Sequence, residues 1–305
     1  MNRARSLLLA FFAPLAWATN VVASRVIVVN GVDPFALTAI RWLLVAVMLA
    51  GYSFALGLGV PLGRRLLLAG LLGITLFNNL LYVALRFAPA ALVGLTFALL
   101  PIVTMLLAEA MGLEKGDNIL YLAAILGLLG VTLIELGSYK GSLHGGKAWL
   151  GVLIAVISVF VWALYTIESK KLMRGLHPLA ALAGSTLLST PFNIVVALPQ
   201  LPGSVIRLAE PRLLVLLLYI VAVPGFLAYI AWFHAVKALG ASTTSLFVNL
   251  LPVFTTILAW ILLGERLRGT QLAGAILVFT ALGLATIRYA RITYYTPRTR
   301  GARAH

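Results

Sequence analysis

Ten apolar stretches of about 20 residues follow one another along the chain, and short breaks rich in turn-forming residues separate them. About 20 consecutive apolar residues are needed for a helix to cross the ~30 Å hydrocarbon core of a bilayer. A helix satisfies every backbone amide within its own segment, and the sequence lacks the short alternating strands of a barrel. The stretches cover residues 7–28, 34–57, 66–85, 88–110, 118–137, 148–168, 178–198, 212–233, 240–263 and 270–290. The sequence therefore predicts an all-α integral membrane protein with ten transmembrane helices.

The composition excludes an ordinary soluble surface. Hydrophobic residues make up 62% of the chain and charged residues only 10%, with a mean hydropathy of +1.06. Soluble proteins carry roughly a quarter charged residues. The net charge of +15 comes from bases that cluster at the ends of the apolar stretches, where anionic headgroups attract them. We therefore expect the lipid bilayer as a partner and no nucleic acid.

The residue types that carry catalysis or bind metals are sparse. The chain has no cysteine, and its four histidines are scattered at positions 144, 177, 234 and 305. No constellation of acid, base and nucleophile is visible near one end of the spans. We expect no enzymatic activity, no catalytic residue, no metal site and no cofactor.

One segment of the chain occurs twice. Residues 99–115 read LLPIVTMLLAEAMGLEK and residues 250–266 read LLPVFTTILAWILLGER, so an offset of 151 aligns the two halves. We predict a first repeat over residues 1–140, a second over 148–292, and a basic tail over 293–305. Because each repeat has an odd number of spans, the second copy inserts upside down. Inverted repeats are typical of transporters, since two oppositely inserted copies can exchange shapes and open the centre to alternate sides.

Lys and Arg are distributed unequally between the two sides of the predicted bundle. If the N-terminus is cytoplasmic, 14 of the 23 basic residues fall on cytoplasmic segments and eight on outer segments, while Arg41 lies within a span. The positive-inside rule therefore places both termini in the cytoplasm. The first apolar run is too long for a signal peptide and lacks a clear cleavage site, so we expect it to be retained as a span.

Four segments carry a resemblance to a known family. They read AWATNVVASR at 16–25, DPFALTAIRWLLVA at 33–46, YVALRFAPAALVGLTFALLP at 82–101, and the LLPVFTTILAWILLGER already quoted. With them the chain resembles the EamA-type branch of the drug/metabolite transporter superfamily, and within it the bacterial amino-acid exporters of the YddG type. The resemblance implies ten helices in two inverted five-helix repeats around a central cavity, with helices five and ten outside it. It also implies export across the bacterial inner membrane.

Polar and aromatic residues deep within the spans are the candidates for lining that cavity. A polar amide that faces lipid is costly, so it should face a partner helix or water. Residues 78, 79 and 82 lie on roughly one helix face, and Trp17 and Trp162 occupy corresponding places in the two halves. The alternatives are packing between helices or an interfacial aromatic belt. The predicted substrate-binding residues are Trp17, Asn20, Asn78, Asn79, Tyr82, Thr96, Trp162, Tyr165, Tyr229, Ser242 and Asn249.

Two prolines at matching mid-span sites, Pro101 and Pro252, are predicted hinges. Proline removes an amide donor and frees the carbonyl one turn earlier. The freed carbonyls of Phe97 and Val248 then bond substrate or water, or simply allow a kink.

Arg41 is the only basic residue well within a predicted span. We expect it to form a structural ion pair with Asp33 in the preceding loop, because a long side chain can snorkel outward. The alternative is a gate or a contact with a substrate carboxylate.

No acidic residue lies at the centre of a predicted span, since Glu109 and Glu168 fall near cytoplasmic ends and Glu135 near an outer end. Proton-coupled exchangers generally need a buried carboxylate. We therefore predict a mostly uncharged cavity that passes small-molecule solutes, namely hydrophobic, aromatic or small neutral amino acids, by facilitated diffusion and alternating access. The alternative is a proton-coupled drug or metabolite exporter of the same fold.

The oligomeric state stays open between a monomer and a homodimer. Helices five and ten are rich in small residues, which permit close helix contact either within one molecule or between two.

Overall fold

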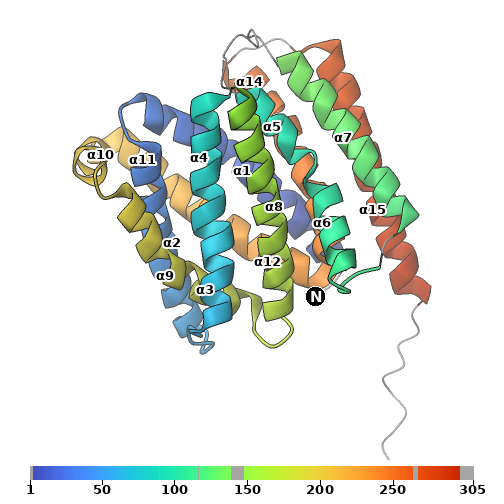
Figure 1. Ribbon diagram of the computed structural model, residues 1–305, viewed down its shortest axis with the longest axis horizontal. Helices are drawn as coiled ribbons and strands as arrows, with labels where there is room; N and C mark the ends of the chain where they lie inside the picture. The colour runs from blue at the N-terminus through green and yellow to red at the C-terminus, as the bar shows by residue number, and fades with distance from the viewer. Residues whose placement is uncertain (1–2, 89, 116, 139–147, 264–266, 296–305) are drawn as a thin grey trace, which may run out of the picture.

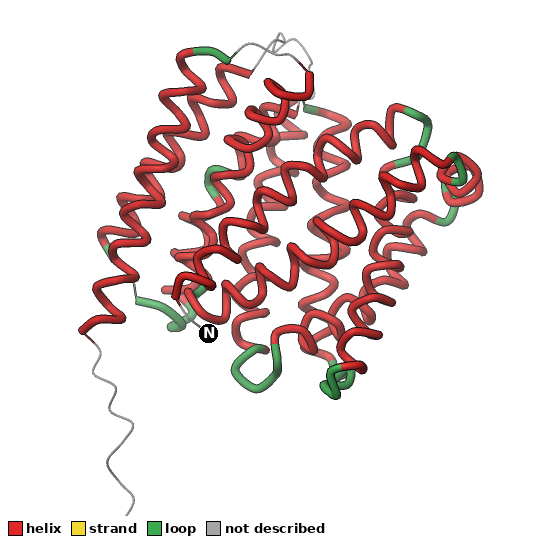
Figure 2. The backbone as a smooth tube through the Cα atoms, turned by 180° about the vertical axis from the view of Figure 1, so that it is seen from behind, coloured by secondary structure: helices red, strands yellow, loops and turns green. Residues whose placement is uncertain are grey.

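The computed structural model describes residues 3–88, 90–115, 117–138, 148–263 and 267–295. Within these ranges the chain forms helices and connecting loops, and ten segments are long and apolar enough to cross a membrane. They form one bundle in which neighbouring spans run in opposite directions (Figures 1 and 2). The prediction of ten transmembrane helices is confirmed, and the protein is a multi-pass membrane protein.

The first five spans contain two interruptions. Helices α1 (Arg3–Val29), α2 (Pro34–Ala55) and α7 (Asn118–Ser138) are continuous. The third span consists of α3 (Arg64–Gly70), a π-helical segment η1 (Leu71–Leu76) and α4 (Phe77–Phe87), whereas the fourth is divided into α5 (Ala90–Phe97) and α6 (Leu100–Ala110). The division of the fourth span falls just before Pro101, which agrees with the predicted kink.

The second five spans repeat this pattern. Helices α8 (Ala148–Leu172), α9 (Pro178–Ala197) and α15 (Gly269–Tyr295) are continuous. The eighth span again contains a central π-helical segment, η2 (Val221–Leu227), between α11 (Pro211–Ile220) and α12 (Ala228–Leu239). The ninth is α13 (Ala241–Leu246), a 3₁₀ turn η3 (Phe247–Asn249) and α14 (Leu250–Leu263). Matching interruptions at matching places agree with two inverted five-helix repeats.

The bundle has two faces, one at each end of its membrane-spanning helices. The N-terminal face is the one at which α1 begins and α15 ends, and the opposite face is the one at which α1 ends and α2 begins (Figure 1). A short helix, α10 (Leu201–Leu208), lies in the connection between α9 and α11 at the opposite face. The sequence predicts only a turn there, because an eight-residue helix leaves no span-length signal.

Helices α7 and α15 pack as a pair along one side of the bundle (Figure 1). A Cβ on Gly130 would lie 2.6 Å from the carbonyl oxygen of Gly274, so the two backbones approach as closely as glycine permits. These small residues of helices five and ten therefore make an intramolecular contact.

Candidate functional site

A cavity of about 900 Å³ occupies the centre of the bundle. Every membrane-spanning segment except α9 contributes a lining residue, and these residues extend from the middle of the helices to the opposite face. Val29 and Leu85, close to the ends of α1 and α4, border it near that face. As judged from the described residues, the cavity approaches the opposite face and ends at the middle of the helices.

Aromatic rings form the floor of the cavity. The indole rings of Trp17 and Trp162 meet edge to face with centroids 5.6 Å apart, as their corresponding places in the two halves predict. Tyr229 packs against both rings, at 5.5 Å from Trp17 and 6.1 Å from Trp162. The Trp17 Nε1–H donates a hydrogen bond of 3.2 Å to the carbonyl of Pro224 in η2. This contact fixes one indole against the π-helical segment of the second repeat.

Arg41 lines the cavity and is 7% exposed. Its Nη1 donates to the Oδ1 of Asn20 at 3.2 Å, and its Nη2 donates to the Oδ1 of Asn78 at 3.1 Å. The Nε atom is buried and has no hydrogen-bond partner among the described residues. The guanidinium is therefore held by neutral amides from α1 and α4.

The predicted ion pair between Arg41 and Asp33 is wrong. The Asp33 carboxylate caps α2, where it accepts hydrogen bonds from the backbone amides of Phe35 at 2.8 Å and Ala36 at 3.3 Å. An Asp before a Pro at the first helical position is a strong N-cap. Because Asp33 caps the helix, the positive charge of Arg41 faces the cavity, and no carboxylate within the described part of the chain is bonded to it.

The orientation of Asn78 follows from the π-helical segment that precedes it. Wider π turns do not satisfy the backbone in the α-helical register, and the Nδ2 of Asn78 donates to the carbonyls of Gly73 at 3.2 Å and Ile74 at 3.0 Å. With its two donors used on the backbone, its Oδ1 is left to accept from Arg41. The interruption of the third span thereby positions the arginine head.

In the second repeat, Asn249 lines the cavity from η3 and is 1% exposed. Neither its Nδ2 nor its Oδ1 has a hydrogen-bond partner among the described residues. Pro252 lines the cavity one turn further along, and so does Val248. Asn249 therefore places a buried amide in the wall of the cavity.

The cavity includes seven of the predicted substrate-binding residues and excludes four. Its lining includes Trp17, Asn20, Asn78, Tyr82, Trp162, Tyr229 and Asn249. Asn79 points to α9 and donates to the Oδ1 of Asn193 at 3.1 Å. Thr96 bonds the carbonyl of Val93 within its own helix, and Tyr165 is buried against Trp162 and Phe233. The fourth, Ser242, lies in the N-terminal face contact described below, and the predicted hinge Pro101 is also absent from the lining.

Most of the residues that line the cavity are uncharged, as predicted, but three are charged. Arg25, Arg41 and Glu135 all line it, and Gln271 adds a polar side chain. Glu135 and Gln271 belong to α7 and α15, so helices five and ten are not outside the cavity as the resemblance implied. Val131 and Glu135, four residues apart on α7, both face the cavity, and this spacing is a signal that the sequence contained.

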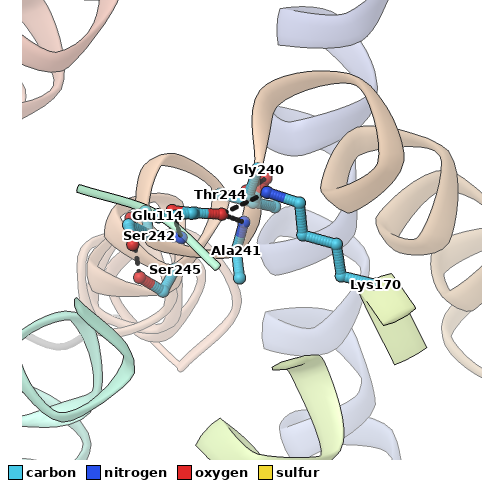
Figure 3. A network of polar contacts seen from close by, with 7 residues as sticks. All are labelled: Glu114, Lys170, Gly240, Ala241, Ser242, Thr244 and Ser245. Carbon is cyan, nitrogen blue, oxygen red and sulfur yellow. Dashed lines mark hydrogen bonds and ion pairs between the residues drawn. The ribbon is translucent and has the colours of Figure 1, made fainter. Parts of the chain in front are cut away.

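At the N-terminal face, Glu114 joins three segments of the chain. Its carboxylate accepts from the Ala241 amide at 2.7 Å and the Ser242 amide at 3.1 Å, and it forms an ion pair with Lys170 (Figure 3). Gly240, at φ +92°, provides the turn before α13, and a Cβ there would lie 2.8 Å from Glu114 Oε1. Burial raises the pKa of Glu114, but the hydrogen bonds and the charge of Lys170 outweigh burial and leave the pKa below its ordinary value. A charged carboxylate therefore ties the two repeats together opposite the open end.

Comparison with known proteins identifies the family. The family model of EamA-like transporters matches residues 4–136 and again residues 149–287. An uncharacterized transporter of Archaeoglobus fulgidus is 29% identical over 297 residues, which cover 94% of this chain and 99% of the relative. The aromatic amino acid exporter YddG of Ancylobacter novellus is 26% identical over 178 residues, covering 57% and 61% of the two chains. A solved crystal structure superposes with a TM-score of 0.78 at 21% identity, over 95% of this chain and 99% of that one. The chain belongs to the EamA-like transporter family.

Proposed function

We propose that the protein exports amino acids with hydrophobic or aromatic side chains across the bacterial inner membrane by alternating access. The excess of Lys and Arg on segments at the N-terminal face supports a cytoplasmic orientation of that face. The central cavity then faces outward. One relative, YddG of Ancylobacter novellus, is named as an exporter of aromatic amino acids.

The observation that carries the proposal is Arg41. A buried charge without an opposite partner is unstable in a low-dielectric site, and its two bonded partners, Asn20 and Asn78, are neutral. A substrate carboxylate completes the site, because a guanidinium binds carboxylates with two charge-assisted hydrogen bonds. The aromatic floor, with Trp17 and Trp162, offers edges and faces to a substrate side chain.

A comparison of one equivalent position in the two repeats supports alternating access. Under the offset that aligns Trp17 with Trp162, Arg25 corresponds to Lys170. Lys170 is paired with Glu114 at the closed N-terminal face, whereas Arg25 lines the open cavity. Equivalent positions of the two repeats are thus in different states, which is what an outward-facing state of an inverted repeat requires.

The test measures exchange of labelled phenylalanine by the purified protein in liposomes. Arg41→Met should lower phenylalanine exchange by roughly 10- to 100-fold, because hydrogen bonds to a charged group contribute about 1.5–3 kcal/mol. Arg86→Met is the matched control, since Arg86 is exposed at the end of α4 and stacks on Phe35 at 4.7 Å, outside the cavity lining. Phenylethylamine, which lacks the carboxylate, should not exchange through the wild-type protein.

Wild-type exchange rates in Arg41→Met would refute the assignment of the carboxylate to Arg41. The second candidate function, a proton-coupled exporter of cationic drugs or metabolites, is favoured by one observation, the presence of Glu135 in the cavity. Exchange of phenylethylamine without exchange of phenylalanine would favour that candidate instead.

A further inference from the structure

Glu135 lines the cavity but has no role in the proposed contact between Arg41 and the substrate carboxylate. It projects from α7 near the opposite face and lies beside Gly94 of α5, where a Cβ would be 2.8 Å from its Oε1. Glycine at position 94 therefore leaves room for the carboxylate. Val131, one turn earlier, continues the same cavity-facing stripe.

Glu135 has no hydrogen bond or ion pair within the described parts of the chain. Five of the other acids are engaged: Asp33 caps α2, Glu109 accepts from Tyr121, Glu114 pairs with Lys170, Asp117 with Arg288, and Glu168 with Lys171. A largely buried carboxylate that binds neither a donor nor a cation is costly when charged. Such a group is stable in two ways, as the neutral acid or with a cation bound.

Among the side chains that the structure describes, the charged and titratable groups around Glu135 are few. Those that line the cavity with it are Arg25, Arg41, Tyr82 and Tyr229. On the helices packed against α7, Glu109 of α6 and Arg288 of α15 are engaged near the N-terminal face, by Tyr121 and Asp117 respectively, and Arg268, just before α15, is exposed. The lining therefore combines arginines, which attract a carboxylate, with one acid, which attracts an ammonium group or a proton.

We propose that Glu135 binds the ammonium group of the substrate and, in alternation, a proton, so that each amino acid exported is exchanged for one proton. This inference rests on the proposed function. On the outer side, a proton from the medium binds a carboxylate oxygen and the substrate ammonium leaves. The neutral acid returns to the inner side, loses the proton to the cytoplasm and binds the next substrate. Because the substrate is a zwitterion, each cycle moves one positive charge inward.

The first measurement is concentrative uptake of labelled phenylalanine into liposomes whose lumen is more acidic than the medium, with the membrane potential clamped. One-for-one exchange should concentrate phenylalanine about tenfold per unit of pH gradient, since one pH unit is about 1.4 kcal/mol. Glu135→Asp should retain accumulation, whereas Glu135→Gln should lose it. Glu210→Gln is the matched control, because Glu210 is exposed at the opposite face and lies outside the cavity lining.

The second measurement is proton release when phenylalanine binds to the purified protein in weakly buffered detergent solution. The wild type, Glu135→Asp and Glu210→Gln should release protons on binding, and Glu135→Gln should release none. Accumulation by Glu135→Gln equal to that of the wild type, or binding to the wild type without proton release, would overturn the proposal. Failure of the wild type to exchange phenylalanine at equal pH would instead refute the proposed function itself.

Discussion

At the scale of single residues, two adjacent asparagines have different surroundings. Asn78 faces the cavity and bonds Arg41, whereas Asn79 faces α9 and bonds Asn193. The sequence predicts both as cavity residues, because positions 78, 79 and 82 lie on broadly one side of a helix. Adjacent residues differ by about 100° around a helix axis, and the packing of α9 against η1 and α2 decides which amide reaches the cavity.

Substitution of these asparagines should separate substrate affinity from stability. In Asn78→Ala, Arg41 loses one acceptor and two backbone carbonyls lose a donor, so we expect KM for phenylalanine to rise roughly tenfold, from about 1–3 kcal/mol per unsatisfied buried group. Asn79→Ala should lower Tm and leave KM unchanged. The measurements are exchange kinetics in liposomes and thermal unfolding in detergent. An equal rise of KM in both variants would contradict these assignments.

At the scale of elements, the interruptions of the spans position the functional groups. The π-helical segment of the third span orients Asn78, and that of the eighth contains Pro224, which accepts from Trp17. Helix α13 begins at Ala241, just after Gly240, and the backbone amides of Ala241 and Ser242 bind Glu114 there. Local sequence predicts the Pro101 kink, but a π turn has no comparable one-residue signal, so hydropathy alone did not reveal it.

Weakening the contact at the N-terminal face should open that face. Lys170 is paired with Glu114 across the two repeats, and each side chain is about one-fifth exposed. Loss of such a pair is worth roughly 1 kcal/mol, or about a fivefold change in population. Because the chain has no cysteine, Ser245→Cys reports access to α13. A maleimide should label the cysteine of Ser245→Cys several-fold faster when Lys170→Met is also present.

The matched control for this experiment is Lys171→Met. Lys171 pairs with Glu168 of its own helix, so its loss should leave labelling of Ser245→Cys unchanged. The lowered pKa of Glu114 sets the pH dependence: its contacts are fully present above the ordinary pKa of a glutamate and are lost only as the pH falls through the lowered value. The thiol itself reacts faster as the pH rises, because the thiolate is the nucleophile. The ratio of the labelling rates with and without Lys170→Met cancels this effect and should be constant across neutral pH, and a change in that ratio would show that another group titrates.

At the scale of the whole molecule, the two faces differ in charge and in closure. The N-terminal face carries more Lys and Arg and the Glu114 contact, whereas the cavity lies toward the opposite face. Helix α1 begins and helix α15 ends at the N-terminal face (Figure 1), as an even number of spans requires. If that face is cytoplasmic, the structure corresponds to the outward-facing stage of the proposed cycle.

Cysteine labelling tests this orientation directly. Leu62, 67% exposed between α2 and α3, marks the N-terminal face, and Ile206, 75% exposed on α10, marks the opposite face. In spheroplasts, a membrane-impermeant maleimide should label Ile206→Cys at once and Leu62→Cys only after permeabilisation. The reverse pattern would show that the positive-inside rule fails for this chain and that the cavity faces the cytoplasm.

The sequence by itself determined the membrane class, the ten spans and the two-repeat organisation, because hydrophobic length and internal similarity are properties of the chain alone. It also identified Trp17 and Trp162 as residues at corresponding places in the two halves, and Arg41 as the only basic residue well within a predicted span. Tertiary structure decided which side chains share the cavity. Asp33 caps a helix instead of pairing with Arg41, and Glu135 enters the cavity beside Gly94. Both outcomes depend on how helices rotate against their neighbours, and a hydropathy pattern does not specify that rotation.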